Sequence, residues 1–320
     1  MSEQNFQPTG MHHVSALSAH IQRSHDFYTQ VLGMRPLLKT VNQDDPRMYH
    51  LFYGDGAASV GSDLTFFDLP KAARERHGNN SIIRSGLRIA SDNSFDYWQD
   101  RLDSFGVQRT IVHERNGHRV IDFEDREGTQ LSLIDDGGQE AAFPWDASPV
   151  PVEHQIRGLA YVNIMVPILA PTDRFLREVL GLERRDSYPA QGAPKFQTYV
   201  YTMGEGKLQQ QLHVTVRDDL PAAKYGAGGV HHLALRVQAN QSIQAWAERI
   251  SQFGYRHSGV IDRHYFRSIY VREPNGVLIE LATDEPGFFV DGPVDANRLT
   301  LPPALEDRRS EIEANLQPLI

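Results

Sequence analysis

The sequence predicts an α+β fold of four βαβββ modules, arranged as two tandem halves. The chain has 320 residues, which is longer than one ordinary domain. A helix-ending pattern at 26–34, DFYTQVLGM, returns at 174–182 as RFLREVLGL. A repeat that keeps one spacing over a long stretch indicates a duplicated chain. The spacing of 148 residues relates Gly33 to Gly181, Gly106 to Gly254 and Gly128 to Gly276.

Hydrophobic periodicity predicts the elements of each module in order. Short apolar or alternating runs predict strands, and a 3.6-residue pattern predicts a helix. In the first quarter we expect strands over 14–17, 36–41, 48–53 and 63–67, and a helix over 21–33. In the second quarter we expect strands over 87–90, 107–113, 119–123 and 130–134, and a helix over 95–105. The third and fourth quarters follow at the same offset. A glycine ends each predicted helix, as expected for a left-handed cap.

The repeat also sets the expected domain boundaries. We expect an N-terminal half over 1–137, a linker over 138–157, a C-terminal half over 158–284 and a tail over 285–320. The tail contains a predicted helix over 305–316. The equivalent residues Trp98 and Trp246 are expected in the core. Scattered charge over 113–119 predicts an exposed hairpin.

Composition excludes several classes of function. The chain has no cysteine, which removes disulfides, iron–sulfur clusters and zinc–thiolate sites, so any metal must be held by nitrogen and oxygen. The net charge of −9, without a clustered basic run, disfavours nucleic acid or an anionic membrane as a partner. No stretch approaches the roughly 20 apolar residues that span a bilayer, and the polar N-terminus lacks a signal pattern. We therefore expect a cytoplasmic protein.

Two histidines and one glutamate occupy equivalent inward positions of the modules. A βαβββ module curls its sheet, and two modules together form a trough into which the first and last strands point. The repeat gives eight such positions, of which only His13, His232 and Glu280 are good metal ligands. Each histidine belongs to a doublet, and strand alternation lets one member of each doublet face the trough. The eight positions are His13, Arg84, Tyr161 and His232 on first strands, and Phe66, Ser132, Val214 and Glu280 on last strands.

Glu280 is one charged residue within the apolar strand 276–282, GVLIELA. Burying an unpaired carboxylate is costly, so it needs a metal, another cation or strong hydrogen bonds. A salt bridge to Arg236 is the alternative partner. Two imidazoles and one carboxylate form the facial triad of non-haem Fe(II) oxygenases, for which Mn(II) or Zn(II) could substitute. Modules one and four must then face each other, and modules two and three form a second trough without a metal.

At these positions the sequence resembles the vicinal oxygen chelate superfamily, which has the glyoxalase/bleomycin resistance/extradiol dioxygenase fold. Within it, the sequence is similar to the hydroquinone-type ring-cleaving extradiol dioxygenases. Catechol-type enzymes resemble it less, because they take both histidines from the C-terminal half, where this chain has Tyr161. The matching stretches, which run over nearly the whole chain, are 11–15 (MHHVS), 49–53 (YHLFY), 149–154 (PVPVEH), 231–234 (HHLA) and 270–280 (YVREPNGVLIE).

The resemblance implies an oxidoreductase that opens an aromatic diol with O₂ and incorporates both oxygen atoms. It implies Fe(II) held by His13, His232 and Glu280. It also implies surrounding residues that act on the substrate, although strand alternation turns the two histidines among them away from the metal. These residues are Tyr270, Arg263, Ser15, His12 and His231. Proteins built of such modules often associate, so a homo-oligomer is expected.

Two other functions remain open on the same modules. A glyoxalase-like isomerase or lyase usually has four protein ligands, whereas the fourth position here is Phe66. A non-enzymatic binder of the bleomycin-resistance type needs no metal triad. Bound iron and oxygen consumption would distinguish the dioxygenase from both.

Overall fold

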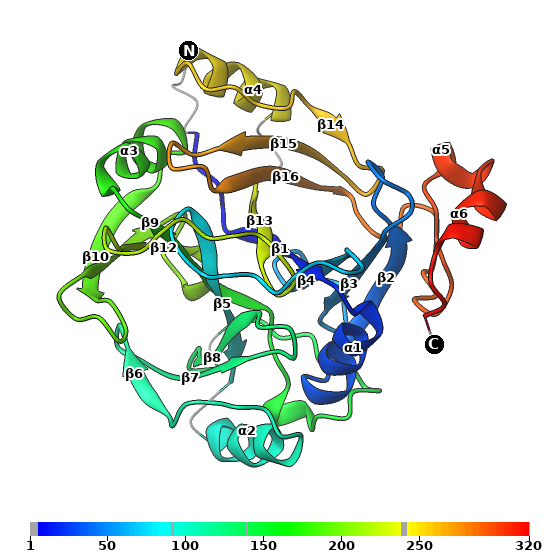
Figure 1. Cartoon of the computed structure of the whole chain (residues 1–320), viewed down its shortest axis with the longest axis horizontal. Coiled ribbons are helices and arrows are strands. Elements are labelled where there is room, and N and C mark those ends of the chain that lie inside the picture. Colours follow the sequence, from blue (N-terminus) through cyan, green and yellow to red (C-terminus); the bar gives the residue numbers. More distant parts are fainter. Residues whose placement is uncertain (1–5, 91–92, 139, 238–241, 320) are drawn as a thin grey trace.

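The computed structural model describes residues 6–90, 93–138, 140–237 and 242–319, and it contains the four predicted βαβββ modules (Figure 1). The first residues of the predicted N-terminal half, 1–5, lie outside this description. The first module comprises β1 (Met11–Ser18), α1 (Ile21–Asp26), β2 (Arg35–Val41), β3 (Tyr49–Gly54) and β4 (Asp63–Asp68). The second comprises β5 (Ser81–Ile89), α2 (Asn93–Ser104), β6 (His113–Arg115), β7 (His118–Glu124) and β8 (Gln130–Asp135).

The second half repeats this order. The third module comprises β9 (Leu159–Val166), α3 (Leu169–Arg174), β10 (Glu183–Pro189), β11 (Gln197–Thr202) and β12 (Gln211–Val216). The fourth comprises β13 (Val230–Arg236), α4 (Ile243–Gln252), β14 (Ile261–Asp262), β15 (Phe266–Arg272) and β16 (Leu278–Pro286). A π-helical turn extends α1 over Phe27–Val31 and α3 over Phe175–Val179. Both turns end just before a glycine of positive φ, Gly33 at 68° and Gly181 at 72°, which confirms the predicted caps.

Within the ranges that the structure describes, strand pairing joins the modules into one curled sheet of sixteen strands. In each module the first and last strands pair in parallel, as β1 does with β4. Between halves, β1 pairs antiparallel with β13, and β5 pairs antiparallel with β9. Modules one and four therefore meet along one seam, and modules two and three along the other, as the sequence predicts. We call the concave face of modules one and four the first trough, and that of modules two and three the second.

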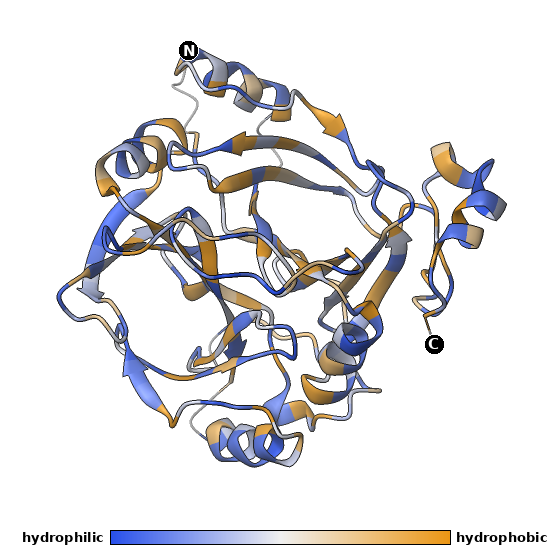
Figure 2. Cartoon of the chain, in the orientation of Figure 1, coloured by the Kyte–Doolittle hydropathy of each residue, from blue (hydrophilic) through white to orange (hydrophobic). Residues whose placement is uncertain are grey.

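The module helices lie around the perimeter of the sheet, and hydrophobic residues recur along the strands (Figures 1 and 2). Trp98 of α2 and Trp246 of α4 are fully buried against the sheet, which confirms their predicted place in the core. No helix in the described ranges is long and apolar enough to cross a membrane.

The tail returns from module four to module one. Its helices are α5 (Pro303–Glu306) and α6 (Arg309–Asn315), so the predicted helix over 305–316 is interrupted near Asp307. The Thr300 amide donates to the Lys39 carbonyl of β2, at 2.9 Å, and Leu301, Ile312 and Leu316 are buried. The tail thus packs against the edge of the first module beside β2 (Figure 1).

Two local predictions were wrong. The predicted strand over 107–113 has only one isolated bridge, between Arg109 and Phe123, because the chain pairs again only in β6. Phe66 and Val214 do not face the troughs, because they pack in the hydrophobic core. By strand alternation their neighbours Thr65 and His213 face inward instead.

Candidate metal centre

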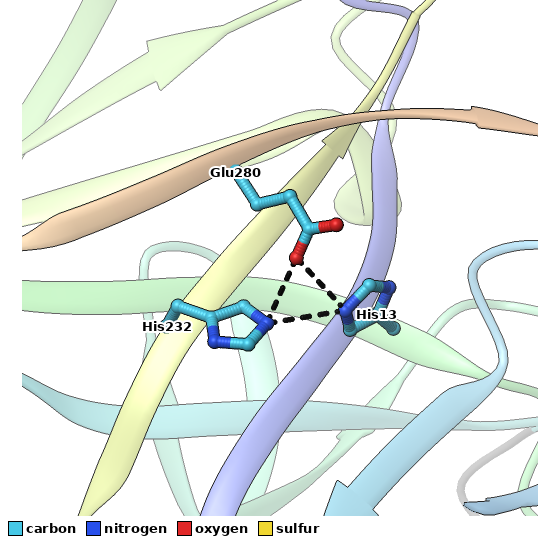
Figure 3. Close-up of side chains that lie close together, drawn as sticks. All are labelled: His13, His232 and Glu280. Atoms are coloured by element: carbon cyan, nitrogen blue, oxygen red, sulfur yellow. Dashed lines mark hydrogen bonds and ion pairs between the residues drawn. The ribbon is translucent and has the colours of Figure 1, made fainter. Parts of the chain in front are cut away.

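Three buried donor atoms from three strands converge in the first trough (Figure 3). His13 lies on β1, His232 on β13 and Glu280 on β16. The two Nε2 atoms are 3.3 Å apart, and Glu280 Oε2 lies 3.3 Å from His13 Nε2 and 2.9 Å from His232 Nε2. All three residues are at most 3% exposed. Within the described part of the chain, this is the one group of three such residues able to hold a metal ion.

Strand register produces this convergence. Ser15 of β1 is opposite His232 of β13, so His13 lies two residues away on the same face. Glu280 is opposite Ala234, again two residues from His232 on the same face. Because side chains alternate, these offsets place all three donors above the seam between modules one and four.

The donor set fits a divalent cation. Metal–ligand bonds of about 2.1 Å place neighbouring ligands about 3.0 Å apart at right angles and about 3.4 Å apart in a tetrahedron. Glu280 Oε1 accepts a hydrogen bond from Ser268, but the buried Oε2 has no hydrogen-bond partner among the described residues. Burial alone would raise the pKa of Glu280, yet His13 and His232 hold it well below its usual range. An ionised, partly unsatisfied oxygen beside two imidazoles is what a metal would complete.

The histidine that precedes each donor contacts the donor ring from behind. His12 Nδ1 lies 2.9 Å from His13 Nδ1, and His12 Nε2 lies 3.1 Å from the Thr283 carbonyl. Burial lowers the pKa of His12 to about 3, so its ring is neutral. A carbonyl only accepts, so the single proton of His12 belongs on Nε2, and its Nδ1 must accept from His13. This leaves the lone pair of His13 Nε2 directed at the cluster.

The second doublet repeats the arrangement. His231 Nδ1 lies 2.8 Å from His232 Nδ1, and burial lowers the pKa of His231 to about 4. Neither His12 nor His231 belongs to the three-donor group. Each is placed to fix the ring orientation of a donor, and His12 also fixes the tautomer of His13, which is the usual role of residues behind metal-bound histidines.

The family resemblance also implies Tyr270, Arg263 and Ser15, and the structure places these residues around the three donors. Tyr270 pairs directly with Glu280 across β15 and β16, and its ring lies 5.5 Å from that of His232. The Arg263 guanidinium lies 5.3 Å from the Tyr270 ring centre and pairs with Asp44 at 2.9 Å. Ser15 is fully buried and shares a 2.7 Å hydrogen bond with Thr65. It therefore supports the trough floor.

A cavity of about 370 Å³ opens beside the donors, a size suited to a small ligand. Its wall includes His13 and His232, together with Tyr270 and Arg263 from module four. Apolar side chains supply much of the remainder, among them Phe52, Phe67 and Phe266. A flat apolar ring with a few polar groups matches such a lining.

His50 is a cavity residue that sequence reasoning missed. Its Nε2 lies 2.9 Å from Thr65 Oγ1, and its ring packs 4.1 Å from those of Phe52 and Phe67. Burial lowers its pKa well below the ordinary value. The stretch 49–53 carries part of the family resemblance, and alternation along it is the signal that places His50 on the trough side.

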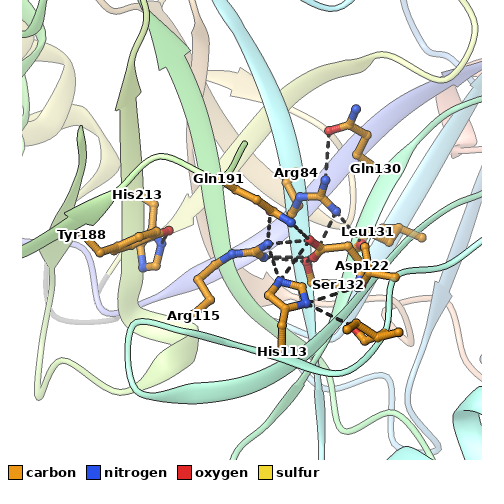
Figure 4. A network of polar contacts seen from close by, with 12 residues as sticks. Arg84, His113, Arg115, Asp122, Gln130, Leu131, Ser132, Tyr188, Gln191 and His213 are labelled. Atoms are coloured by element: carbon orange, nitrogen blue, oxygen red, sulfur yellow. Dashed lines mark hydrogen bonds and ion pairs between the residues drawn. The ribbon is translucent and has the colours of Figure 1, made fainter. Parts of the chain in front are cut away.

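The second trough holds an arginine where the first has its three donors (Figure 4). Arg115 Nη1 donates to Tyr161 OH at 2.6 Å, Asp122 Oδ1 at 3.0 Å and Ser132 Oγ at 3.1 Å. Arg84 adds a second cation 3.2 Å from Asp122. Burial alone would raise the pKa of Asp122, but Arg115 and Arg84 hold it below its usual range.

The two troughs correspond residue by residue at the 148-residue spacing. Tyr161, Arg84 and Ser132 are the counterparts of His13, His232 and Glu280. Arg115 and Asp122 likewise match Arg263 and Tyr270. The hairpin over 113–119 is present, but Arg115 within it is 7% exposed rather than solvated.

The fold and the donor set define a class, and comparison with known proteins agrees. The sequence model of one protein family, the Glyoxalase/Bleomycin resistance protein/Dioxygenase superfamily, matches residues 10–133 and 158–281 of this chain. The chain therefore belongs to this superfamily, with one matched segment in each half.

Individual relatives carry names that are more specific than that of the superfamily. MhqA of Bacillus subtilis (strain 168), whose name describes a ring-cleaving dioxygenase, is 42% identical over 313 residues, covering 97% of this chain and 98% of that protein. The chlorohydroquinone/hydroquinone 1,2-dioxygenase of Sphingobium indicum is 28% identical, covering 95% of this chain and 94% of that protein. A crystal structure of a Bacillus subtilis protein described as a dioxygenase superposes with a TM-score of 0.89 at 30% identity, covering 98% of each chain. Glyoxalase I of Zea mays, at 15% identity and a TM-score of 0.63, covering 86% of this chain and 92% of that one, shares the fold.

Proposed function

We propose that the protein is an Fe(II)-dependent ring-cleaving dioxygenase that opens a hydroquinone with O₂. The observation that carries the proposal is the group formed by His13, His232 and Glu280, which opens onto an aromatic-lined cavity. Two imidazoles and one carboxylate are the donor set of non-haem Fe(II) oxygenases, in which other coordination positions stay open. The names of the relatives support the same reaction class and a hydroquinone substrate.

The chain supplies the metal ligands and their support. His13 Nε2, His232 Nε2 and Glu280 Oε2 would hold the ion, which when bound would bring diol and O₂ together and conduct electrons between them. His12 would keep the His13 imidazole in the tautomer that presents Nε2, and His231 would orient the ring of His232. Ser268 would orient the carboxylate through its second oxygen.

Tyr270 and Arg263 would act on the substrate oxygens. Burial raises the pKa of Tyr270, so its hydroxyl stays protonated and can donate a hydrogen bond. Asp44 and Tyr270 raise the pKa of Arg263 against the effect of burial, so its guanidinium stays charged. A fixed positive charge beside the cavity would stabilise negative charge that develops on an oxygen of the opening ring. The aromatic walls would keep bulk water away from the reacting atoms.

The number of protein ligands, three rather than four, favours a dioxygenase over a glyoxalase-like isomerase. The fourth inward position is Thr65, whose hydroxyl is engaged by Ser15 at 2.7 Å and His50 at 2.9 Å. A neutral, hydrogen-bonded hydroxyl is a poor fourth ligand, so positions for both diol and O₂ would remain open.

Anaerobic reconstitution with Fe(II), followed by oxygen uptake with hydroquinone, chlorohydroquinone and catechol, tests the proposal. We expect iron-dependent uptake of one O₂ per hydroquinone, both atoms of ¹⁸O₂ in the ring-opened product, and weaker turnover of catechol. His232→Gln should abolish uptake, whereas His20→Gln, which changes an exposed histidine, should not. Undiminished uptake without iron would refute the proposal.

A further inference from the structure

A hydrogen-bonded chain of three side chains leads from the floor of the first trough to the cavity, and His50 lies at its cavity end. Ser15 Oγ lies 2.7 Å from Thr65 Oγ1, which lies 2.9 Å from His50 Nε2. Ser15 and Thr65 are 0% exposed, whereas His50 is partly exposed and lines the cavity. Because water does not reach the two hydroxyls, their protons must find acceptors within the chain.

The protons of these three side chains all have acceptors in one arrangement alone. Burial lowers the pKa of His50 well below its ordinary value, so the imidazole is neutral and has a single N–H. With that proton on Nε2, His50 would donate to Thr65 and Thr65 to Ser15. The Ser15 proton would then have no acceptor among the described residues, which is costly for a buried donor. In the opposite direction Ser15 donates to Thr65 and Thr65 donates to His50 Nε2, which leaves the imidazole proton on Nδ1.

His50 Nδ1 is accessible to a ligand. It has no hydrogen-bond partner among the described residues, and it is not one of the buried polar atoms that lack a partner, so a water-sized molecule reaches it. The ring centre of His50 lies 4.1 Å from those of Phe52 and Phe67, and this packing holds the imidazole in place. Since the side chain lines the cavity, the structure presents one oriented N–H donor there.

This donor lies within reach of a ligand anchored at the metal-binding group. The ring centre of Phe67 is 4.1 Å from that of His50 and 6.3 Å from that of His232, so one aromatic ring separates the two imidazoles. Both metal-binding histidines and Glu280 also influence the pKa of His50, which agrees with this proximity. An aromatic diol with a metal–oxygen bond of about 2.1 Å and a hydrogen bond of about 2.9 Å at its two ends is long enough to span the separation.

We propose that His50 Nδ1 donates a hydrogen bond to the oxygen of the bound diol that the metal does not hold. This inference rests on the proposed function, because it takes the three-donor group as the anchor of the first oxygen. Ser15 and Thr65 are positioning residues, because their hydroxyls keep the imidazole proton on the nitrogen that faces the ligand. A ligand without the second oxygen leaves this donor unpaired, and such a site strongly disfavours it.

The tautomer of His50 can be measured directly. Long-range ¹H–¹⁵N correlation spectra of the protein loaded with diamagnetic Zn(II) distinguish protonated from unprotonated ring nitrogens, and His50→Phe identifies the His50 signals by their loss. We expect the proton on Nδ1 in the unaltered protein and a mixture of tautomers in Thr65→Val, where Nε2 has lost its donor. A proton on Nε2 in the unaltered protein, or a tautomer that Thr65→Val leaves unchanged, overturns the proposed direction of the chain.

Equilibrium binding under anaerobic conditions tests the contact itself on the iron-loaded protein. Titration calorimetry would compare hydroquinone with phenol, which has one hydroxyl and so lacks the second oxygen. We expect the unaltered protein to bind hydroquinone at least about tenfold more tightly. His50→Phe should abolish this preference, whereas His50→Asn, which keeps an amide donor near the position of Nδ1, should retain about threefold. Because the ratio compares two ligands of one protein, changes in folding or in metal affinity affect both alike.

His154 provides a matched control. Its partly exposed ring stacks 4.4 Å from that of Tyr97 and its Nδ1 lies 3.1 Å from the Ser94 hydroxyl, outside the cavity. His154→Phe should therefore keep the tenfold preference. A preference that survives in His50→Phe, is lost equally in His50→Asn, or is absent from the unaltered protein overturns the assignment. Hydroquinone binding that is no tighter with iron than without it overturns the proposed function instead, so the two failures are distinguishable.

Discussion

Replacing Glu280 with glutamine should remove most of the stability that a bound metal adds to the protein. Without metal, the 0% exposed carboxylate pays a desolvation cost of several kcal/mol, but its neighbours more than offset that cost, because His13 and His232 hold the pKa of Glu280 well below its usual range. The neutral amide keeps the hydrogen bond from Ser268 but loses this electrostatic stabilisation. We therefore expect the metal-free variant to be less stable than the metal-free wild type.

With metal, the difference in stability between the two proteins should widen. Fe(II) at 100 times its dissociation constant would stabilise the wild type by about 2.7 kcal/mol, or about 5 °C in Tm for a chain of this size. Loss of the anionic ligand should weaken binding at least about 100-fold, which leaves about 0.4 kcal/mol at the same metal concentration. Anaerobic thermal unfolding with and without Fe(II) would measure both differences.

Glu273 provides a matched control for this experiment. It is 1% exposed, but both of its oxygens accept hydrogen bonds, from the Val277 amide at 3.0 Å and the Thr172 hydroxyl at 2.5 Å. Glu273→Gln should lower Tm equally with and without Fe(II). If Glu280→Gln likewise kept the full gain in Tm from Fe(II), the assignment of Glu280 as a ligand would be wrong.

Three further predictions concern other charged groups. Arg115→Met should lower the free energy of unfolding by about 3–5 kcal/mol in chemical denaturation, because it leaves buried Asp122 with one cation, and adding Asp122→Leu should not restore it, because Arg84 would then lose its carboxylate. Burial raises the pKa of Asp68 to about 6. Ionisation of Asp68 therefore lowers the free energy of unfolding progressively as the pH rises from about 4 to above 6, by at most about 3 kcal/mol in total. Asp68→Asn should therefore raise Tm at pH 7.5 and not at pH 4, and an equal gain at both would contradict this. Asp44→Asn should change kcat/KM for hydroquinone by less than about fivefold, because that carboxylate is 70% exposed, whereas Arg263→Met should lower it about 100-fold or more.

Repetition is the reason that the modules and the donor group could be predicted from sequence. A single spacing of 148 residues located equivalent strands, and alternation within each doublet selected His13 and His232 over their neighbours. Glu280 stood out because it interrupts an apolar strand. The structure brings these three side chains together as expected.

The remaining site residues depend on information that local patterns do not carry. Two adjacent phenylalanines, Phe66 and Phe67, hid which face of β4 is inward, and Thr65 was overlooked as a result. Arg115 lies in a charged hairpin and was therefore predicted to be solvated, although the repeat spacing aligns it with Arg263.

The division of the donors between the two halves has an evolutionary consequence. One imidazole comes from the first half, and the other imidazole and the carboxylate come from the second, so neither half carries a full set. A free-standing half would have to associate with a copy of itself, and both resulting interfaces would then contain the same side chains. Fusion into one chain removes that symmetry, because a mutation now alters one interface and spares the other. One interface could thus keep the three-donor group while its twin acquired an internal guanidinium that holds the two modules together.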